Sequence, residues 1–377
     1  MSGQPKNTGF SAKDPDSPSG FSFWESKHWV PTQDAVVVGA GIVGMNAALA
    51  LRKRHPSWTI SILDRAPIGS ASTRNAGFAC FGSPSELLDD WKQMGPEPTL
   101  EMVEMRWKGL LALRETWGDE AIAYRACGAV EAFTDPDLHA EAKDFLPVLN
   151  QQLAPIMGRE VFAETTANKN GLQRLCGSIS SPLEGSVDTA RMIASMRSAL
   201  APAGIQWLAG MSVEAVEAAP EGWSLATPHG VLNASRVFLA TNALASDLVP
   251  VDVGPVPNMV LVSQPLPELR LTSTVHHDRG YVYAREVDGR ILIGGGRQWD
   301  CQDPGESEER LVAWAQRHIQ GAEAFATAHR WTGQLGVGSM RLPIVQEVKP
   351  GLYVGVRLGG MGVAIGTHIG QSMAGLA

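Results

Sequence analysis

Cysteine, tyrosine and clustered charge are all scarce in this 377-residue sequence, which has four cysteines and four tyrosines. The cysteines are scattered and form no C-x-x-C pair: Cys80, Cys127, Cys176 and Cys301. Neither a disulfide framework nor a metal site is therefore predicted, and reduced thiols in a cytoplasmic protein are the simplest interpretation. The net charge is −8 and no basic run is present, so a nucleic-acid partner is not expected.

Long apolar runs are also missing, apart from one between residues 35 and 51. Its glycines and Asn46 fit a buried strand followed by a helix better than a membrane span, so no span is predicted. The start of the chain is polar and rich in Gly, Ser and Pro, and residues 1–30 are predicted to form a flexible arm. The aromatic residues within it are expected to dock on the body of the protein: Phe21, Phe23, Trp24 and Trp29.

The clearest local structure is a strand–helix–strand unit in residues 34–64. An uncharged β-branched run leads into Gly39-x-Gly41-x-x-Gly44, and Asp64 ends the next strand 20 residues after the last of these glycines. Such a turn lets backbone approach a pyrophosphate at a helix N-terminus, and an acid at this distance binds a ribose diol. A dinucleotide-binding site is therefore predicted. The pattern alone does not choose between NAD and FAD, but the long polar loop after Asp64 favours a ligand that extends beyond its pyrophosphate.

A second glycine-rich strand-to-helix turn closes the chain, at residues 355–370. Between the two turns the patterns predict helices at 100–118, at 188–204 with Asp188 as cap, and from Asp303 to about residue 319. Alternating residues at 280–296 predict an antiparallel hairpin with Asp288-Gly289 at its turn.

Several ordered motifs carry a resemblance to a known family. They are Gly39–Gly44 with Asp64, "GSASTRNAGF" at 69–78, "SRVFLATNALASDL" at 235–248, "YVYAREVDGRILIGGG" at 281–296 and "LGGMGVAIGTHIG" at 358–370. Together they resemble the D-amino-acid oxidase (glycine/sarcosine oxidase) superfamily of FAD-dependent oxidoreductases. "STRNAGF" and "SMRLP" resemble the branch that contains γ-glutamylputrescine oxidoreductase.

The resemblance implies an α/β fold, with a Rossmann-like FAD-binding domain and an inserted α+β substrate domain built on a mixed sheet. The expected FAD-binding domain is discontinuous, at 31–90, 180–245 and 340–377, and the substrate domain comprises 91–179 and 246–339. The residues expected to bind FAD are Gly39, Gly41, Ile42, Val43, Gly44, Asp64, Arg65, Ser72, Thr73, Arg74, Asn75, Ala76, Gly77, Val213, Thr241, Gly359, Gly360, Met361, Gly362 and Val363. The first turn would hold the adenine-side pyrophosphate and the last would lie against the flavin.

The expected substrate residues lie on the hairpin and near the end of the chain. Strand alternation places Tyr281, Tyr283 and Arg285 on one face, where phenols and a guanidinium suit an amino acid. Arg341 lies near the position of the family's carboxylate-binding arginine, although Leu342 separates it from the proline. His276 and His277 are interpreted as surface loop residues rather than catalytic bases.

The expected reaction is oxidation of a C–N bond in an amino acid or related amine to an imine by hydride transfer to the flavin. O₂ or another acceptor would then reoxidise the flavin. Two alternatives stay open: a flavin enzyme acting on a 2-hydroxy acid, and a flavin-binding protein without catalytic function.

Overall fold

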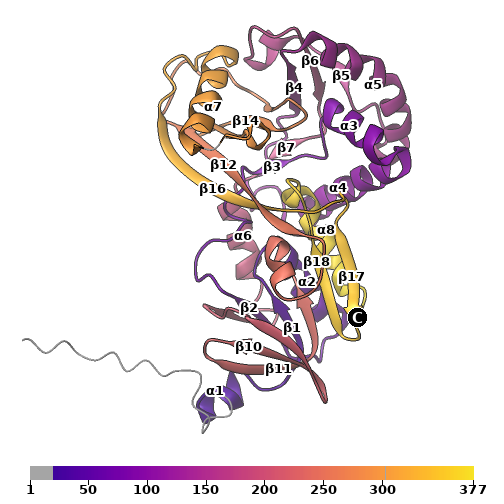
Figure 1. Ribbon diagram of the computed structural model, residues 1–377, viewed down its shortest axis with the longest axis vertical. Coiled ribbons are helices and arrows are strands. Elements are labelled where there is room, and N and C mark those ends of the chain that lie inside the picture. Colours follow the sequence, from indigo (N-terminus) through magenta and orange to yellow (C-terminus); the bar gives the residue numbers. More distant parts are fainter. Residues whose placement is uncertain (1–19, 302) are drawn as a thin grey trace, which may run out of the picture.

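The computed structural model describes residues 20–301 and 303–377, and it contains two eight-stranded sheets that stand one above the other (Figure 1). The first sheet has the order β17-β18-β11-β1-β2-β8, with β10 and β9 attached beside β11. Its strands are β1 (Gln33–Val38), β2 (Ile60–Asp64), β8 (Gln206–Ala209), β9 (Ala215–Ala219), β10 (Gly222–Thr227), β11 (Gly230–Leu239), β17 (Ile344–Lys349) and β18 (Leu352–Val356).

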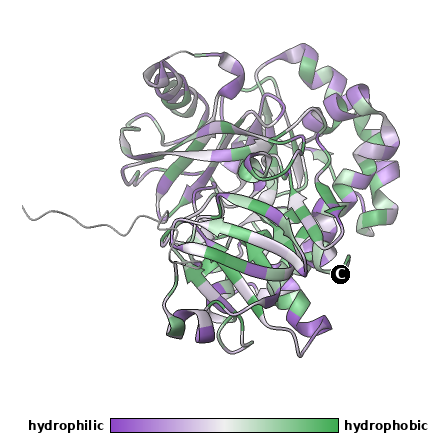
Figure 2. Ribbon diagram, turned by 60° about the horizontal axis from the view of Figure 1, so that its bottom comes forward, coloured by the Kyte–Doolittle hydropathy of each residue, from purple (hydrophilic) through white to green (hydrophobic). Residues whose placement is uncertain are grey.

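Strands β1, β2, β8, β11 and β18 pair in parallel, as the strand–helix–strand unit predicts. Ala35–Val38 of β1 are buried, which explains why this strand has no alternation in its sequence. Helices cover one face of the sheet: α2 (Ile42–Arg54), α4 (Pro96–Trp117), α6 (Thr189–Ser198) and α8 (Gly362–Ala374). Hydrophobic colour is concentrated on the central strands in Figure 2.

The second sheet is mixed and has the order β16-β12-β15-β14-β13-β4-β6-β5. Its strands are β4 (Ala129–Phe133), β5 (Ala163–Glu164), β6 (Gly177–Ser181), β12 (Gly254–Ser263), β13 (Thr274–His277), β14 (Val282–Val287), β15 (Arg290–Gly295) and β16 (Thr327–Val337). The predicted hairpin is β14–β15, and its turn residues Asp288 and Gly289 both have positive φ. That conformation is the one a two-residue hairpin turn requires.

Three further helices pack on this second sheet or beside it. α7 (Pro304–His318) packs against the hairpin, while α3 (Pro84–Met94) and α5 (Pro136–Met157) pack against β4 and β6. A two-stranded sheet of β3 (Phe78–Ala79) and β7 (Gly185–Ser186) lies between the two large sheets in Figure 1. Short 3₁₀ turns complete the elements: η1 (Ala167–Asn170), η2 (Asn242–Asp247) and η3 (Arg297–Trp299).

The predicted caps are found at the N-termini of α6 and α7, and the predicted glycine ends α4, which begins four residues before the predicted start at residue 100. The Asp188 carboxylate accepts from the backbone N–H groups of residues 190 and 191, and Asp303 caps α7 ahead of a proline at its first position. Gly118 ends α4 as expected. α6 ends at Ser198, earlier than Gly204, because the chain turns there to enter β8.

Helices α2 and α8 approach each other to backbone contact. A Cβ built on Gly370 lies 2.5 Å from the Val43 carbonyl oxygen, and one on Gly366 lies 2.6 Å from the Ile42 side chain. Larger residues would push the helices apart. The glycines of the terminal motif thus bring the N-termini of α2 and α8 to the same end of the first sheet.

The prediction for the N-terminal segment is partly wrong. Residues 1–19 lie outside the described residues, but the rest of the supposed arm contains α1 (Phe23–His28), which Ser22 and Glu25 cap reciprocally. The expected docking of the aromatic cluster is also wrong for three of its members, because Phe23, Trp24 and Trp29 are 67%, 66% and 56% exposed. Phe21 instead packs beside the core of the first sheet.

The strands of the first sheet all fall within 31–90, 180–245 and 340–377. The second sheet takes strands from both 91–179 and 246–339, and β6 extends two residues beyond the expected limit at 179. The domain limits themselves stay a prediction. Within residues 20–301 and 303–377, no helix combines the length and apolarity that crossing a bilayer needs.

Candidate cofactor and substrate site

A large cavity runs between the two sheets, and both glycine-rich turns line it. Its volume is about 1120 Å³. Pockets for drug-sized molecules measure roughly 300–1,000 Å³, so this cavity has room for a dinucleotide. The start of α2 lies at one part of its wall and the start of α8 at another, which accounts for the presence of two glycine turns in one chain.

At the first turn, side chains from distant segments meet the start of α2. The Ser72 hydroxyl accepts a hydrogen bond from the Ile42 N–H at 3.0 Å, and a Cβ on Gly41 would lie 2.9 Å from that hydroxyl oxygen. Asp64 accepts from the Ala40 N–H at 2.6 Å and from the Ala66 N–H at 2.8 Å. Asp64 therefore fixes the turn and also faces the cavity, where its remaining lone pairs can accept from a ribose.

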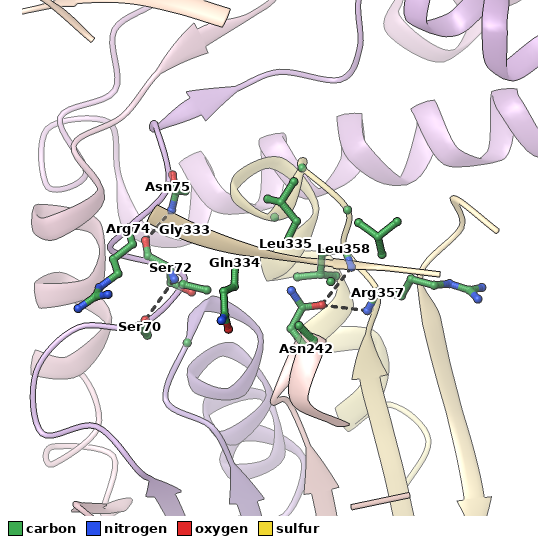
Figure 3. Close-up of a pocket in the computed structure, with 18 of the residues that line it drawn as sticks. Ser70, Ser72, Arg74, Asn75, Asn242, Gly333, Gln334, Leu335, Arg357 and Leu358 are labelled. Atoms are coloured by element: carbon green, nitrogen blue, oxygen red, sulfur yellow. Dashed lines mark hydrogen bonds between the residues drawn. The ribbon is translucent and has the colours of Figure 1, made fainter. Parts of the chain in front are cut away.

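The polar loop after Asp64 is held against the second sheet (Figure 3). Asn75 donates to the Ser72 carbonyl at 2.6 Å and accepts from the Gly77 N–H at 2.8 Å. The Trp331 indole donates to the Arg74 carbonyl at 2.9 Å. This loop is thus an ordered wall of the cavity, as the interpretation of an extended ligand requires.

The second glycine turn is fixed by Asn242 and by β16. The Asn242 side-chain oxygen accepts from the N–H groups of Arg357 and Leu358, at 3.0 and 3.3 Å (Figure 3). The Gly359 N–H donates to the Gly336 carbonyl at 3.0 Å. The side chain of the cap residue Met361 makes no hydrogen bond to the start of α8. The first N–H groups of this helix can therefore donate to a ligand.

Two observations within the described part of the chain show that this cavity fits a bound group. The Thr241 hydroxyl and the Asn258 side-chain oxygen are buried, line the cavity and have no hydrogen-bond partner. A Cβ on Gly359 or Gly360 would meet no described atom within 4 Å, so the backbone of this turn is open to the cavity. Unpaired buried polar atoms are costly, and a polar ligand would satisfy them.

Seventeen of the twenty residues expected to bind FAD line the cavity, and Gly44, Thr73 and Gly77 do not. Gly44 lies under the first turn, where a Cβ would be 1.8 Å from the Gly39 carbonyl oxygen. Thr73 hydrogen-bonds to Ser70 within the loop. Gly77 has a φ of 72° and packs against Val187. All three shape the wall from behind.

Tyr281 and Tyr283 face the cavity from the hairpin. The Tyr283 hydroxyl accepts from the Asn258 amide at 2.6 Å, and burial raises the pKa of this phenol above its ordinary value. The phenol is therefore neutral and can donate its proton to a ligand. The Arg297 guanidinium stacks on the Tyr281 ring at 4.7 Å.

Arg285 lies on the same side of β14 as Tyr283 but does not line the cavity. Its side chain is buried and donates to the carbonyls of Ala76 (2.7 Å) and Val187 (3.2 Å). This guanidinium holds the polar loop against β7, away from the cavity in which a substrate would lie. The expectation that Arg285 binds substrate is therefore not supported by its position.

Arg341 lines the cavity but is already paired. It lies 3.0 Å from Asp89 and also contacts Asp90, which is fully buried. Burial, together with the Glu86 charge, raises the pKa of Asp90 to about 6, although Arg341 opposes the shift. Glu86 pairs with Arg106 at 3.2 Å through one oxygen, whereas its other oxygen is buried without a hydrogen bond to any described residue.

The two histidines are on strand β13, not in a surface loop, so that interpretation is wrong. His276 is 4% exposed and lines the cavity, with its Nε2 3.3 Å from Glu184. Burial alone would lower its pKa, but hydrogen bonds with Cys80 and Glu184 raise the pKa of His276 well above its ordinary range. His277 faces the other way and hydrogen-bonds to the Ala132 carbonyl.

Several cavity residues were not predicted, among them Asn242, Asn258 and Arg297. Asn258 is a polar residue inside an otherwise apolar strand, a signal that the sequence did contain. Arg297 follows β15, and its guanidinium makes no ion pair with any residue that the structure describes. Arg297 is held at the cavity wall by stacking on the Tyr281 ring, and the spacing of these two residues in the sequence does not reveal that contact.

Comparison with known proteins decides the family. The family model described as FAD dependent oxidoreductase (DAO) matches residues 34–376. The chain belongs to this family of FAD-dependent oxidoreductases. Its cofactor is FAD, and the expectations of an enzyme, of this fold class and of this family are confirmed.

Relatives of this oxidoreductase are distant in sequence but similar in fold. It is 23% identical to the bifunctional protein ThiO/ThiG of Synechocystis sp. over 80% of this chain, although the match spans only 45% of that longer protein. It is 22% identical to γ-glutamylputrescine oxidoreductase of Escherichia coli, over 90% of this chain and 82% of the relative. The glycine oxidase structure from Geobacillus kaustophilus superposes with a TM-score of 0.74 and 23% identity, covering 92% of this chain and 94% of that one.

Proposed function

We propose that this oxidoreductase oxidises the C–N bond of a small amino acid or related amine to an imine. One observation carries the choice of an amine: the unpaired oxygen of Glu86. The Glu86 side chain is 10% exposed, lines the cavity, and has one oxygen without a hydrogen-bond partner in the described chain. A buried carboxylate oxygen is best satisfied by a charge-assisted donor, which an ammonium group supplies and a hydroxyl group does not match.

The tyrosines and Arg297 support an acidic group on the same substrate. Arg297 is exposed at the cavity wall, stacked on Tyr281, and has no carboxylate partner among residues 20–301 and 303–377. A guanidinium fork binds a carboxylate through two hydrogen bonds, and the Tyr283 hydroxyl can add a third. We therefore assign the carboxylate contact to Arg297 in place of Arg285 and Arg341, whose guanidinium groups are engaged.

FAD, when bound, would supply the acceptor for the hydride on the carbon that bears the nitrogen, and the Glu86 carboxylate would take the proton that the ammonium must lose first. The residues of this chain orient the substrate and exclude water. The start of α8, with its free N–H groups near Gly360 and Gly362, favours negative charge on a group bound beside it. Asp64, Ser72 and Thr241 are the further residues that we assign to FAD.

The test is a screen for anaerobic flavin bleaching with the FAD-loaded enzyme. D- and L-amino acids, N-methyl amino acids, polyamines and 2-hydroxy acids are compared as substrates. We expect bleaching by an amine and none by the hydroxy acid of matched carbon skeleton. Bleaching by the hydroxy acid alone would contradict the proposal, and so would an absence of bleaching by every compound. Glu86→Gln should lower kcat/KM for the amine, since it removes the carboxylate that faces the ammonium.

A further inference from the structure

Three side chains that the proposed reaction does not use meet at the cavity wall. Cys80, Glu184 and His276 are 3%, 1% and 4% exposed, and each offers one ligand atom within 4.8 Å of the other two. Cys80 follows β3, Glu184 precedes β7 and His276 is on β13. They are more than 90 residues apart along the chain, so no metal-binding motif is visible in the sequence.

We propose that Cys80, Glu184 and His276 bind a thiophilic divalent cation such as Zn²⁺. A thiolate, an imidazole nitrogen and a carboxylate oxygen are the three ligand types that zinc takes in proteins. The His276 Nε2 and the Glu184 Oε2 are 3.3 Å apart. Bond lengths of about 2.0–2.2 Å in a tetrahedral site put such a nitrogen and oxygen roughly 3.3–3.5 Å apart. By the same reasoning, the Cys80 sulfur would lie about 3.6 Å from the nitrogen and from the oxygen in a tetrahedral site. The three ligand atoms lie within 4.8 Å of one another here, so a small movement of the thiol completes the geometry.

The carboxylate is held in the orientation that a ligand needs. The second oxygen of Glu184 accepts from the N–H groups of Phe81 and Gly82, at 2.8 and 3.2 Å. This leaves Oε2 directed at His276 and the neighbouring thiol. Outer hydrogen bonds of this kind fix the ligands of metal sites and raise their affinity.

The fourth position faces the cavity. Cys80 and His276 line the cavity, and so does Met361, whose sulfur lies 3.4 Å from the Cys80 sulfur. Three protein ligands with an open position are typical of zinc sites that exchange their fourth ligand. Water, or the thioether of Met361, can complete the coordination, and the ion can enter through the cavity.

A bound metal would affect the second glycine turn. Met361 lies between Gly360 and Gly362, the segment that we assign to the flavin. We expect Zn²⁺ to restrain this segment and inhibit turnover, and this consequence rests on the proposed function. Binding of the metal does not rest on the proposed function, so the metal site and the proposed function can fail separately.

The experiment uses FAD-loaded enzyme treated with a chelator and then titrated with Co²⁺ as a spectroscopic probe. A cobalt–thiolate site gives charge-transfer and d–d absorption bands, and the d–d bands lie at longer wavelength than the flavin bands. We expect one Co²⁺ per chain, displaced by Zn²⁺. Cys80→Ser should abolish the thiolate band, and His276→Gln and Glu184→Gln should weaken affinity by at least about 100-fold, since losing even an outer hydrogen bond costs about 10–100-fold. Cys176→Ser and His277→Gln are matched controls and should bind as the wild type does.

A thiolate band that persists in Cys80→Ser, or equal losses in His276→Gln and His277→Gln, would overturn the proposal. So would wild-type enzyme that forms no such band at saturating Co²⁺, which would leave the cluster as a metal-free ion pair beside a thiol. If the variants do not fold, alkylation of the wild type decides. Zn²⁺ must protect Cys80 and not Cys176 from iodoacetamide, as measured by mass spectrometry, and equal labelling of Cys80 with and without Zn²⁺ would refute the site.

Discussion

The guanidinium of Arg341 lies 3.0 Å from the carboxylate of Asp89 and contacts Asp90 with its other terminal nitrogen. Both terminal nitrogens of the guanidinium therefore already contact a carboxylate. We expect Arg341→Ala to destabilise the protein by about 1–3 kcal/mol, because it leaves the buried Asp90 without its partner. Thermal unfolding measures this loss. Any change in KM should be equal for amino acids and for amines without a carboxylate, and selective loss of the amino acid would return the anchoring role to Arg341.

Arg297 provides the opposite expectation. Arg297→Lys keeps the charge but loses the fork, so kcat/KM for a carboxylate-bearing substrate should fall by about 10–100-fold. A plain amine of similar size should be nearly unaffected. Arg279→Lys is the matched control, since Arg279 also lines the cavity but is paired with Asp278. Equal effects of the two substitutions would show that Arg297 makes no specific contact with a carboxylate.

Gly41 tests the FAD site at the first turn. A Cβ here would lie 2.9 Å from the Ser72 hydroxyl oxygen, and the branched side chain of Gly41→Val would fill the approach to the helix start. Purified Gly41→Val protein should be colourless, whereas wild-type protein should be yellow and release FAD on denaturation. Gly254→Ala is the control, because a Cβ at Gly254 meets no described atom within 4 Å. Full flavin content in Gly41→Val would refute the assignment.

Gly360 tests the second turn. It faces open space in the cavity, so Gly360→Leu can fold, but its side chain would occupy the volume beside the start of α8. The side chain would hold the bound group away from the N–H groups at the start of α8, and losing one preorganised donor usually costs about 10²–10³-fold. We therefore expect flavin reduction under anaerobic conditions to slow by about that factor. Stopped-flow absorbance measures the rate, and flavin content and melting temperature should stay near wild type. Reduction at the wild-type rate would mean that the turn serves packing alone.

Asp90 makes stability depend on pH in the acid range. Its pKa is about 6 in the folded protein against an ordinary 3.8, so between these values the unfolded chain has released a proton that the folded protein still binds. The contribution of Asp90 to the free energy of unfolding therefore falls as the pH rises from about 4 to about 6. Asp90→Asn should flatten this part of the curve of unfolding free energy against pH, as measured by urea denaturation. Asp89→Asn, at the neighbouring and more exposed carboxylate, should leave the slope in place.

The sequence by itself determined the local elements and the cofactor. The βαβ unit, the caps Asp188 and Asp303 and the turn Asp288-Gly289 follow from interactions between residues close in the chain, and these were predicted correctly. The first glycine turn with Asp64 was recognisable for the same reason, since its spacing reflects one helix start and one adjacent strand. The order of motifs then indicated the FAD-dependent family.

Only the tertiary structure decided which polar side chains are free to bind a substrate. The sequence pointed to Arg285 and Arg341 as substrate residues. In the structure, Arg285 hydrogen-bonds to the backbone carbonyls of Ala76 and Val187. Arg341 is paired with carboxylates of α3. Arg297 and the unpaired oxygen of Glu86 became candidates because their partners are absent from the described chain, and a lack of partners has no sequence signal. The tertiary structure also brought together the cluster of Cys80, Glu184 and His276. Pairing of β3 with β7 and of β13 with β4 sets their positions, and such long-range pairing depends on the packing of the whole chain.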